Sequence, residues 1–308
     1  MKETIHQTPT GCNLSVEELV AFYNKAQATN KERASTTVKD LMVNFLEHTK
    51  QAGRSKAYLT TLKCQLNHSL DYLPKMMSEV KLSHIESCLH SLPNLKTRKN
   101  ARITLITFFK FAKKQGLYSA YEETPAERTI CPKVIPIEPD IFTPEEISRM
   151  LTSEHTNKKQ QAFLILGGFC GIRSAEIHRL TWESVKQDYI LISPSISKTA
   201  RRRLVEIPPN AIEWLDKIRE KSGPVTYMTL QSLYFSLQDL CRKLKIEWKK
   251  NGLRHSFASY HLELHRDAPR TSKTAGHSLA VLETVYSKLV CHAEAEKWFS
   301  ITPKNRLA

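Results

Sequence analysis

A proline-rich stretch divides this sequence of 308 residues into two parts. Residues 123–140, ETPAERTICPKVIPIEPD, contain four prolines and show no helical periodicity. Each proline disfavours the helical conformation in the residue before it, so the stretch predicts an extended linker. At about 3.3 Å per residue such a linker can reach roughly 60 Å, which is enough to keep two domains apart.

Helix signals lie on both sides of this linker. Upstream, successive helical patterns each end at a glycine or before a proline, and no strand pattern interrupts them. Ser15 and Glu18 have the spacing of a capping box, and Thr143 followed by Pro144 predicts the start of another helix. We therefore expect an N-terminal extension with one helix at 1–35, a helical domain at 36–120, the linker at 121–141, and a second domain with a C-terminal tail at 142–308.

One region indicates β-structure. Residues 188–210 show alternation at 189–193 and again at 203–207, on either side of a polar, basic turn. This pattern predicts a hairpin or small sheet. The remainder of the second domain has helical periodicity, so the expected fold is mainly α with a small β-hairpin.

The chain carries a net charge of +15, and its isoelectric point is near 9.5. Basic residues gather in three runs, at 98–114, 198–203 and 241–250. Any one run is typical of a solvated face, but three runs in two regions favour a nucleic acid as partner over a membrane surface. No apolar run approaches the roughly 20 residues that span a bilayer, and the N-terminus lacks the apolar core of a signal peptide. We expect a cytoplasmic protein.

The seven cysteines are scattered and form no C-x-x-C pair. This spacing indicates neither a zinc site nor a disulfide framework. Cysteines of this kind are typical of small buried residues in a reducing compartment.

Several polar residues of the second domain stand where periodicity does not require them. Each has an ordinary structural interpretation: Tyr286, for example, shares one helical face with Leu279, Leu282 and Leu289, which is typical of a core tyrosine. The candidates are Arg173, Glu176, Lys198, Arg254, His255, His277 and Tyr286.

These candidates lie in five short motifs that follow one another in a distinctive order. They are GIRSAEI at 171–177, the hairpin KT at 198–199, NGLRHSFA at 251–258, GHS at 276–278, and a tyrosine nine positions after the histidine of GHS. Together they resemble the tyrosine recombinase (phage integrase) family of site-specific, Xer-like integrases. The resemblance covers 142 to about 290 and implies an α+β catalytic domain. It also implies that 36–120 is a SAM-like helical core-binding domain.

The resemblance implies a role for each candidate. Phosphoryl transfer needs cationic groups around the phosphate oxygens, a nucleophile in line, and a proton for the leaving oxygen. The resemblance implies that Arg173 and Arg254 bind the phosphate and that Lys198 is the general acid. It implies that His277 contacts the phosphate or helps to transfer a proton. Tyr286 is the implied nucleophile, and Glu176 is the implied supporting carboxylate.

The implied reaction uses neither metal nor cofactor. No carboxylate cluster suited to Mg²⁺ accompanies the candidates, and no G-x-x-x-x-G-K-[ST] motif is present. The implied activity is site-specific DNA recombination, by integration or excision, through a 3′-phosphotyrosine intermediate. The implied partners are double-stranded DNA with inverted repeats, three further copies of the chain in a homotetramer, and accessory DNA-bending factors, in a bacterial or phage-derived, nucleoid-associated setting without a membrane.

Position 251 departs from the family pattern. Most members have a histidine three residues before the second arginine, where this chain has Asn251. An amide can donate a hydrogen bond to a phosphate but cannot exchange a proton near neutral pH. We expect Asn251 to be tolerated, and we interpret the neighbouring His255 as a structural residue that supports the site.

Two other functions remain open. A non-catalytic DNA-binding regulator with the same fold would bind DNA with strong salt dependence and form no covalent adduct. A topoisomerase-like enzyme would use the same chemistry to relax supercoils. The last segment, with Trp298 and Phe299, either packs on its own domain or docks on a neighbouring protomer, as the resemblance implies.

Overall fold

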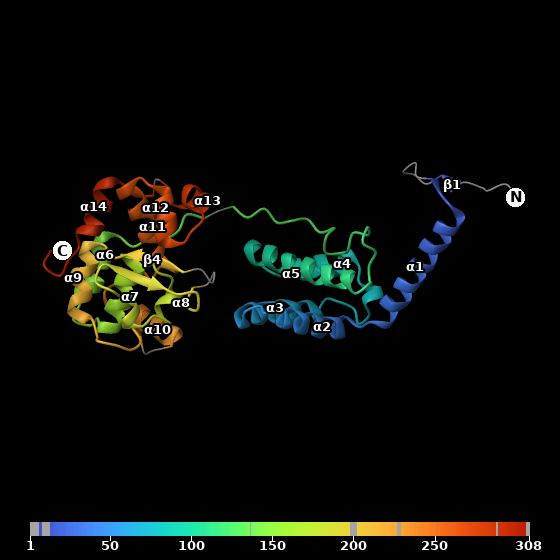
Figure 1. Ribbon diagram of the computed structural model, residues 1–308, viewed down its shortest axis with the longest axis horizontal. Helices are drawn as coiled ribbons and strands as arrows, with labels where there is room; N and C mark the ends of the chain where they lie inside the picture. Colours follow the sequence, from blue (N-terminus) through green and yellow to red (C-terminus); the bar gives the residue numbers. More distant parts are fainter. Residues whose placement is uncertain are drawn as a thin grey trace. The chain divides into compact units, whose positions relative to one another are not determined.

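The computed structural model describes residues 6–7, 13–135, 137–197, 202–226, 229–287 and 289–305. These residues divide into two compact units, Met1–Ile135 and Pro136–Ala308 (Figure 1). The division falls inside the proline-rich stretch. Within the described residues, no helix is both long enough and apolar enough to cross a membrane.

The first unit is built from helices, preceded by a two-residue ladder of β1 (His6–Gln7) and β2 (Asn13–Leu14). The capping box predicted at Ser15 and Glu18 is present at the start of the first helix. The helices are α1 (Val16–Ser35), α2 (Val38–Gln51), α3 (Lys56–Leu70), the 3₁₀ turn η1 (Met77–Glu79), α4 (Leu82–His90) and α5 (Leu95–Lys114).

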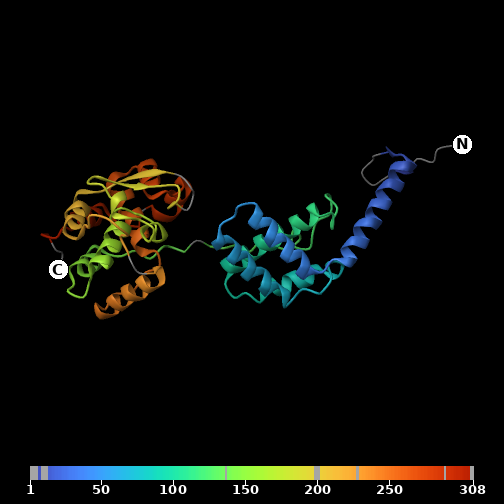
Figure 2. The ribbon, with the colours of Figure 1, turned by 60° about the horizontal axis from the view of Figure 1, so that its bottom comes forward.

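Helices α2 to α5 pack together (Figures 1 and 2). Their apolar core includes several aromatic rings. Phe45 of α2 meets Phe108 of α5 edge to face, with 5.8 Å between ring centroids. Phe109 in turn meets Tyr118, which follows α5. Offset and edge-on ring pairs of this kind add to the stability that burial alone provides.

The second unit contains eleven helical segments and one hairpin among its described residues. The segments are α6 (Pro144–Thr152), α7 (Lys158–Gly168), α8 (Ser174–Ile177), the 3₁₀ turn η2 (Trp182–Ser184), α9 (Pro209–Ile218), α10 (Leu230–Lys243), α11 (Gly252–His265), α12 (Ala268–Ala275), α13 (Leu279–Val281) with the π-helical turn η3 (Leu282–Tyr286), and α14 (His292–Ser300).

The predicted hairpin is confirmed. Strands β3 (Tyr189–Ile192) and β4 (Arg203–Glu206) pair antiparallel, with Ile192 opposite Arg203. Ile190, Ile192 and Val205 are fully buried, and β4 also contacts α12. The mainly helical fold with one small sheet in each unit agrees with the expected fold class.

Helix α11 is central to the second unit, because it contacts α7, α12, α14 and η3. Two hydrogen bonds fix the segment before α6 to α11. The backbone N–H of Phe142 donates to Oγ of Ser256 over 2.7 Å, and the hydroxyl of Tyr260 donates to the carbonyl of Phe142 over 3.0 Å.

The C-terminal segment packs on its own unit. The ring of Trp298 is fully buried and stacks on Tyr260, with 4.5 Å between centroids. Its indole N–H donates to the carbonyl of Gly168 over 3.0 Å, and the carbonyl of Ile301 accepts a bond from Trp214. Trp298 therefore belongs to the core of its own unit.

Replacing Trp298 should therefore destabilise the second unit selectively. We expect Trp298→Ala to lower its free energy of unfolding by about 3–5 kcal/mol, as for other large-to-small changes in a core. All four tryptophans lie in this unit, at 182, 214, 248 and 298, so fluorescence during urea unfolding reports on it alone. Phe235→Ala is the control, because that side chain is 61% exposed and its loss should cost less than about 0.5 kcal/mol. Equal effects of both changes would contradict this account of the core.

Candidate active site

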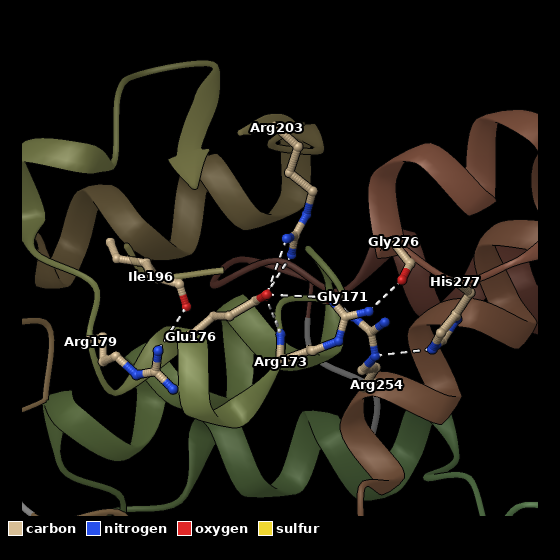
Figure 3. A network of polar contacts seen from close by, with 9 residues as sticks. All are labelled: Gly171, Arg173, Glu176, Arg179, Ile196, Arg203, Arg254, Gly276 and His277. Carbon is tan, nitrogen blue, oxygen red and sulfur yellow. Dashed lines mark hydrogen bonds and ion pairs between the residues drawn. The ribbon is translucent and has the colours of Figure 1, made fainter. Parts of the chain in front are cut away.

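The second unit brings together polar residues from distant parts of the sequence (Figure 3). Arg173 is the N-cap of α8, and Arg254 lies in the first turn of α11. His277 follows α12, and Tyr286 ends η3. Arg254 is hydrogen-bonded to His277, and the ring of His277 stacks on that of Tyr286. Arg173 is hydrogen-bonded to Gly276, the residue before His277.

Glu176 is the carboxylate of the cluster, and its side chain is only 1% exposed. The carboxylate accepts a bond from Nη1 of Arg173 over 3.2 Å. It also accepts two bonds from Arg203, over 3.1 Å to Oε1 and 2.6 Å to Oε2. One buried carboxylate thus holds two guanidinium groups (Figure 3).

These partners determine the ionisation of Glu176. Burial by itself raises the pKa of the carboxyl group, but the hydrogen bonds and positive charge of Arg203 and Arg173 outweigh it. The net result is a lowered pKa, so Glu176 is ionised at neutral pH.

Arg203 was not predicted as a site residue, because in the sequence it stands within the basic run 198–203. Its signal lies in the strand alternation. Arg203 and Val205 are two apart in β4 and so point to the same face of the hairpin, and Val205 is fully buried. A charged residue at an inward strand position requires a buried partner, which here is Glu176.

Arg254 is held by a backbone carbonyl and by an imidazole. Its Nη1 donates to the carbonyl of Gly171 over 2.6 Å, and its Nε donates to Nε2 of His277 over 3.1 Å. Its Nη2 is buried and has no partner among the described residues. Burial, followed by the charge of Arg173, lowers the pKa of Arg254 to about 9, so the group remains a cation at neutral pH.

Two glycines of the sequence motifs fix the two arginines. Gly171 has φ +63°, and a Cβ there would lie 2.2 Å from the ring of Phe257. Gly276 has φ +64° and caps α12, and its carbonyl accepts a bond from Nη2 of Arg173. Each glycine therefore holds the arginine of another motif: Gly171 holds Arg254, and Gly276 holds Arg173.

His277 is neutral and keeps one free donor. Arginine can only donate, so the Nε2 of His277 accepts from Arg254 and the proton must be on Nδ1. That Nδ1 is buried and lacks a partner among the described residues. Burial, then the charges of Arg254 and Arg173, lower the pKa of His277 to about 3.

Tyr286 is both a core residue and a neighbour of the other candidate site residues. It is 3% exposed and packs in a small apolar cluster with Ala258 and Leu282. Its ring also stacks on His277, with 5.2 Å between centroids and 17° between planes. Burial raises the pKa of the phenol, and Arg254 partly offsets this rise, so the hydroxyl is protonated at neutral pH.

The backbone around Tyr286 differs from the single helix that the apolar stripe predicted. Residues 279–281 form one α-turn, and 282–286 continue as a π-helical turn. Leu279 is 45% exposed although Leu282 is fully buried. The stripe is therefore not one continuous buried face. Single π-turns occur frequently at functional sites.

The other predicted site residues have distinct positions. Lys198 lies outside the described residues, in the segment that joins β3 to β4. Asn251 is exposed and is the N-cap of α11 in a left-handed conformation, with φ 57°. Asparagine tolerates this conformation better than most residues. His255 was interpreted as structural, but its Nδ1 lies 2.7 Å from the hydroxyl of Tyr286.

The basic run 98–114 serves partly to hold the first unit together. Arg98 donates to the carbonyl of Leu92, Arg102 donates to the carbonyl of Thr129, and Lys113 pairs with Glu127. Three other lysines of the run are exposed: Lys99, Lys110 and Lys114. Half of the six basic residues of this run therefore also form contacts within the first unit. Within the described residues, no group of three His, Cys, Asp or Glu side chains could hold a metal ion.

Comparisons with known proteins agree on one family, although no protein-family model matches the chain. A tyrosine recombinase of Pseudothermotoga lettingae is 25% identical over 232 residues, which cover 70% of this chain and 80% of the relative. Tyrosine recombinase XerA of Pyrococcus horikoshii is 22% identical over 275 residues, covering 84% of this chain and 92% of the relative.

Solved structures share the fold. A lambda integrase dimer bound to a COC′ core site superposes with a TM-score of 0.70 at 14% identity, over 93% of each chain. A lambda integrase tetramer bound to a Holliday junction gives a TM-score of 0.67 at 14% identity, over 94% of this chain and 95% of that one. The named relatives support the tyrosine recombinase family for this chain, and the solved structures show that it shares the fold of lambda integrase.

The buried carboxylate gives a test of the cluster. We expect Glu176→Gln to lower the free energy of unfolding of the second unit by about 3–5 kcal/mol at pH 7, because Arg173 and Arg203 lose their buried counter-charge. Tryptophan fluorescence during urea unfolding measures this loss. The exposed Glu213→Gln on α9 is the control.

The same variant should change the pH dependence of stability. The pKa of Glu176 in the folded state is below the reference value of 4.5, so its contribution is complete above that value and is lost as the pH falls through the folded-state pKa. The difference in free energy of unfolding between wild type and Glu176→Gln should therefore become smaller below pH 4.5. A difference that stays constant down to pH 3 would contradict the ion-pair account.

Proposed function

We propose that this chain, as a member of the tyrosine recombinase family, cuts and rejoins DNA at specific sites with Tyr286 as the nucleophile. One observation carries the proposal. Beside the Tyr286 ring, Nη2 of Arg254 and Nδ1–H of His277 are buried donors without a partner among the described residues. Buried donors without a partner are costly, and a phosphate group would satisfy both.

The charges around these donors favour an anion. Arg173, Arg203 and Arg254 lie around a single carboxylate, Glu176, so the cluster has an excess of positive charge. Guanidinium groups bind phosphate through parallel hydrogen bonds. A phosphodiester is the anion that a basic chain with a net charge of +15 would meet on a nucleic acid.

These positions support the following reaction, in which the role of Lys198 is the one that the resemblance implies. Arg173 and Arg254 hold the nonbridging oxygens and stabilise the charge that develops on them. The oxygen of Tyr286 forms a bond to phosphorus, and the bond from phosphorus to the 5′-oxygen breaks. Lys198 supplies the proton to that oxygen. The product is a 3′-phosphotyrosine, and attack by a 5′-hydroxyl from another strand reverses the step and completes an exchange.

The remaining parts of the proposal concern the assembly. We assign DNA binding to both the core-binding domain at 36–120 and the catalytic domain at 142–308, with exposed lysines of α5 such as Lys99 and Lys110 facing the backbone phosphates. A structural neighbour is a lambda integrase tetramer bound to a Holliday junction, which supports a homotetramer acting on two DNA sites. We expect inverted repeats at those sites, accessory DNA-bending factors, and action in the cytoplasm at the nucleoid.

Covalent capture tests the nucleophile and does not require that the DNA site be known. The protein is incubated with nicked duplexes of randomised sequence, because a nick next to the cleaved bond releases the short strand and traps the adduct. DNA that stays attached in hot detergent is then recovered and sequenced. We expect an adduct with wild type and none with Tyr286→Phe, since the variant lacks the attacking oxygen. Tyr189→Phe, on β3, is the matched control and should form the adduct.

The possible outcomes separate the three candidate functions. An adduct that survives in Tyr286→Phe would reject the assignment of the nucleophile. Salt-sensitive binding without any adduct would indicate a DNA-binding regulator. An adduct together with relaxation of supercoils, but without exchange between two recovered sites, would indicate a topoisomerase-like enzyme.

Asn251 gives a separate prediction. Histidine also tolerates the left-handed conformation at this exposed helix start, so Asn251→His should fold normally. We expect its rate of adduct formation on the recovered duplex to stay within about tenfold of wild type, which is less than a general acid or base contributes. A rate hundreds of times higher would mean that the wild-type site lacks a group it needs.

A further inference from the structure

His255 makes the only hydrogen bond that the hydroxyl of Tyr286 forms among the described residues. Its Nδ1 lies 2.7 Å from Oη, which is a short and well-formed contact. The two rings are also close, with 5.6 Å between centroids and 33° between planes. Any account of how Tyr286 loses its proton must therefore include His255.

The protonation state of His255 allows Nδ1 to act as an acceptor. Burial, followed by the charge of Arg254, lowers the pKa of His255, and Asp140 offsets only part of this shift. The imidazole is thus neutral at neutral pH. A neutral imidazole with its proton on Nε2 offers the lone pair of Nδ1 to the hydroxyl of Tyr286.

Neither of the other nearby polar groups can take this proton in the same way. Nε2 of His277 already accepts from Arg254, and its Nδ1 carries a proton. Its ring lies nearly flat on that of Tyr286, so its in-plane nitrogens do not point at the hydroxyl. Asn251 is exposed, and an amide does not accept a proton near neutral pH.

The fold holds His255 in this position. It follows Arg254 in the first turn of α11, where its backbone N–H donates to the carbonyl of Asn251 over 3.0 Å and its carbonyl accepts from Ser259. Ala258 and Leu282, both fully buried, pack beside the Tyr286 ring. The same helical turn therefore supplies a phosphate-binding cation and a partner for the nucleophile.

We propose that His255 is a catalytic residue that accepts the proton of the Tyr286 hydroxyl during strand cleavage. The proposal rests on the nucleophilic role of Tyr286 given above. As the phenolic oxygen bonds to phosphorus, its proton passes to Nδ1 of His255, and the electron pair of the broken bond leaves with the 5′-oxygen. On rejoining, protonated His255 returns the proton to Tyr286 as the phosphotyrosine bond breaks.

The test compares a half-buried and a buried histidine of α11, His255 and His261. His255→Gln keeps a hydrogen-bonding group but cannot accept a proton, whereas His261→Gln alters a histidine that bonds Thr271 outside the site. The probe is the nicked duplex recovered by covalent capture with wild type, and the readout is the single-turnover rate of adduct formation. We expect His255→Gln to be slower by about 10²–10⁴-fold, the usual contribution of a general base, and His261→Gln to be within about threefold of wild type.

The pH profile distinguishes proton transfer from a structural role. The ionisable groups that face His255 are Arg254 on α11, Asp140 before α6, His277 before α13, and Tyr286 itself. Only neutral His255 can accept a proton, so the wild-type rate should rise with pH and level off once the imidazole is neutral. This rise should be absent from His255→Gln. The same inflection in both proteins would overturn the proposal.

A sulfur-substituted duplex separates this step from protonation of the leaving group. When sulfur replaces the 5′-bridging oxygen, the leaving group departs without a proton. The substitution should restore cleavage by Lys198→Ala and leave His255→Gln slow. Restoration of His255→Gln would overturn the proposal, because its defect would then lie on the leaving-group side.

Two further outcomes are decisive. If His255→Gln does not fold, as judged by tryptophan fluorescence, His255→Ala with imidazole in solution replaces it. Recovery in proportion to the neutral imidazole supports the proposal, and no recovery overturns it. A wild-type adduct with an unaffected His255→Gln would reject only the role of His255, whereas the absence of any wild-type adduct would reject the proposed function and this role together.

Discussion

The sharing of one buried carboxylate between two arginines is the interaction on which the rest of the second unit depends. Glu176 is almost fully buried, and it would not be ionised there without Arg173 and Arg203. The two arginines, together with Arg254, would in turn repel one another without it. The carboxylate therefore makes it possible to gather three cations in a region that is largely closed to water.

Each arginine of the cluster depends on a different part of the chain. The carbonyls of Gly276 and Gly171 hold Arg173 and Arg254, and both glycines have positive φ. Arg203 brings in the hairpin. Arg179, which follows α8, also donates to the carbonyl of Ile196, which follows β3 (Figure 3). Ile196 and Arg203, which flank Lys198 in the sequence, are thereby bound to Arg179 and Glu176.

Much of this arrangement could be predicted from local sequence. Proline and glycine positions gave the helix ends, and strand alternation gave the hairpin, because these signals act over a few residues. The motifs also pointed to Arg173, Arg254, His277 and Tyr286, which the structure does bring together.

Contacts between distant segments were beyond such prediction. The bond between His255 and Tyr286 joins residues 31 apart in sequence, and the bonds from Arg203 to Glu176 join residues 27 apart. The π-turn before Tyr286 likewise interrupts a stripe whose spacing alone indicates one regular helix. Each of these features depends on tertiary packing. The periodicity of a sequence segment gives no information about its contacts with distant segments.

The central claim is that the oxygen of Tyr286 becomes bonded to a DNA phosphate. Mass spectrometry of the digested covalent complex tests it most directly. Cleavage after lysine releases the peptide 274–288, TAGHSLAVLETVYSK, which contains a single tyrosine. We predict that this peptide carries the mass of a nucleotide remnant and that fragmentation places it on Tyr286. A remnant attached to any other peptide, with 274–288 recovered unmodified, would contradict the account.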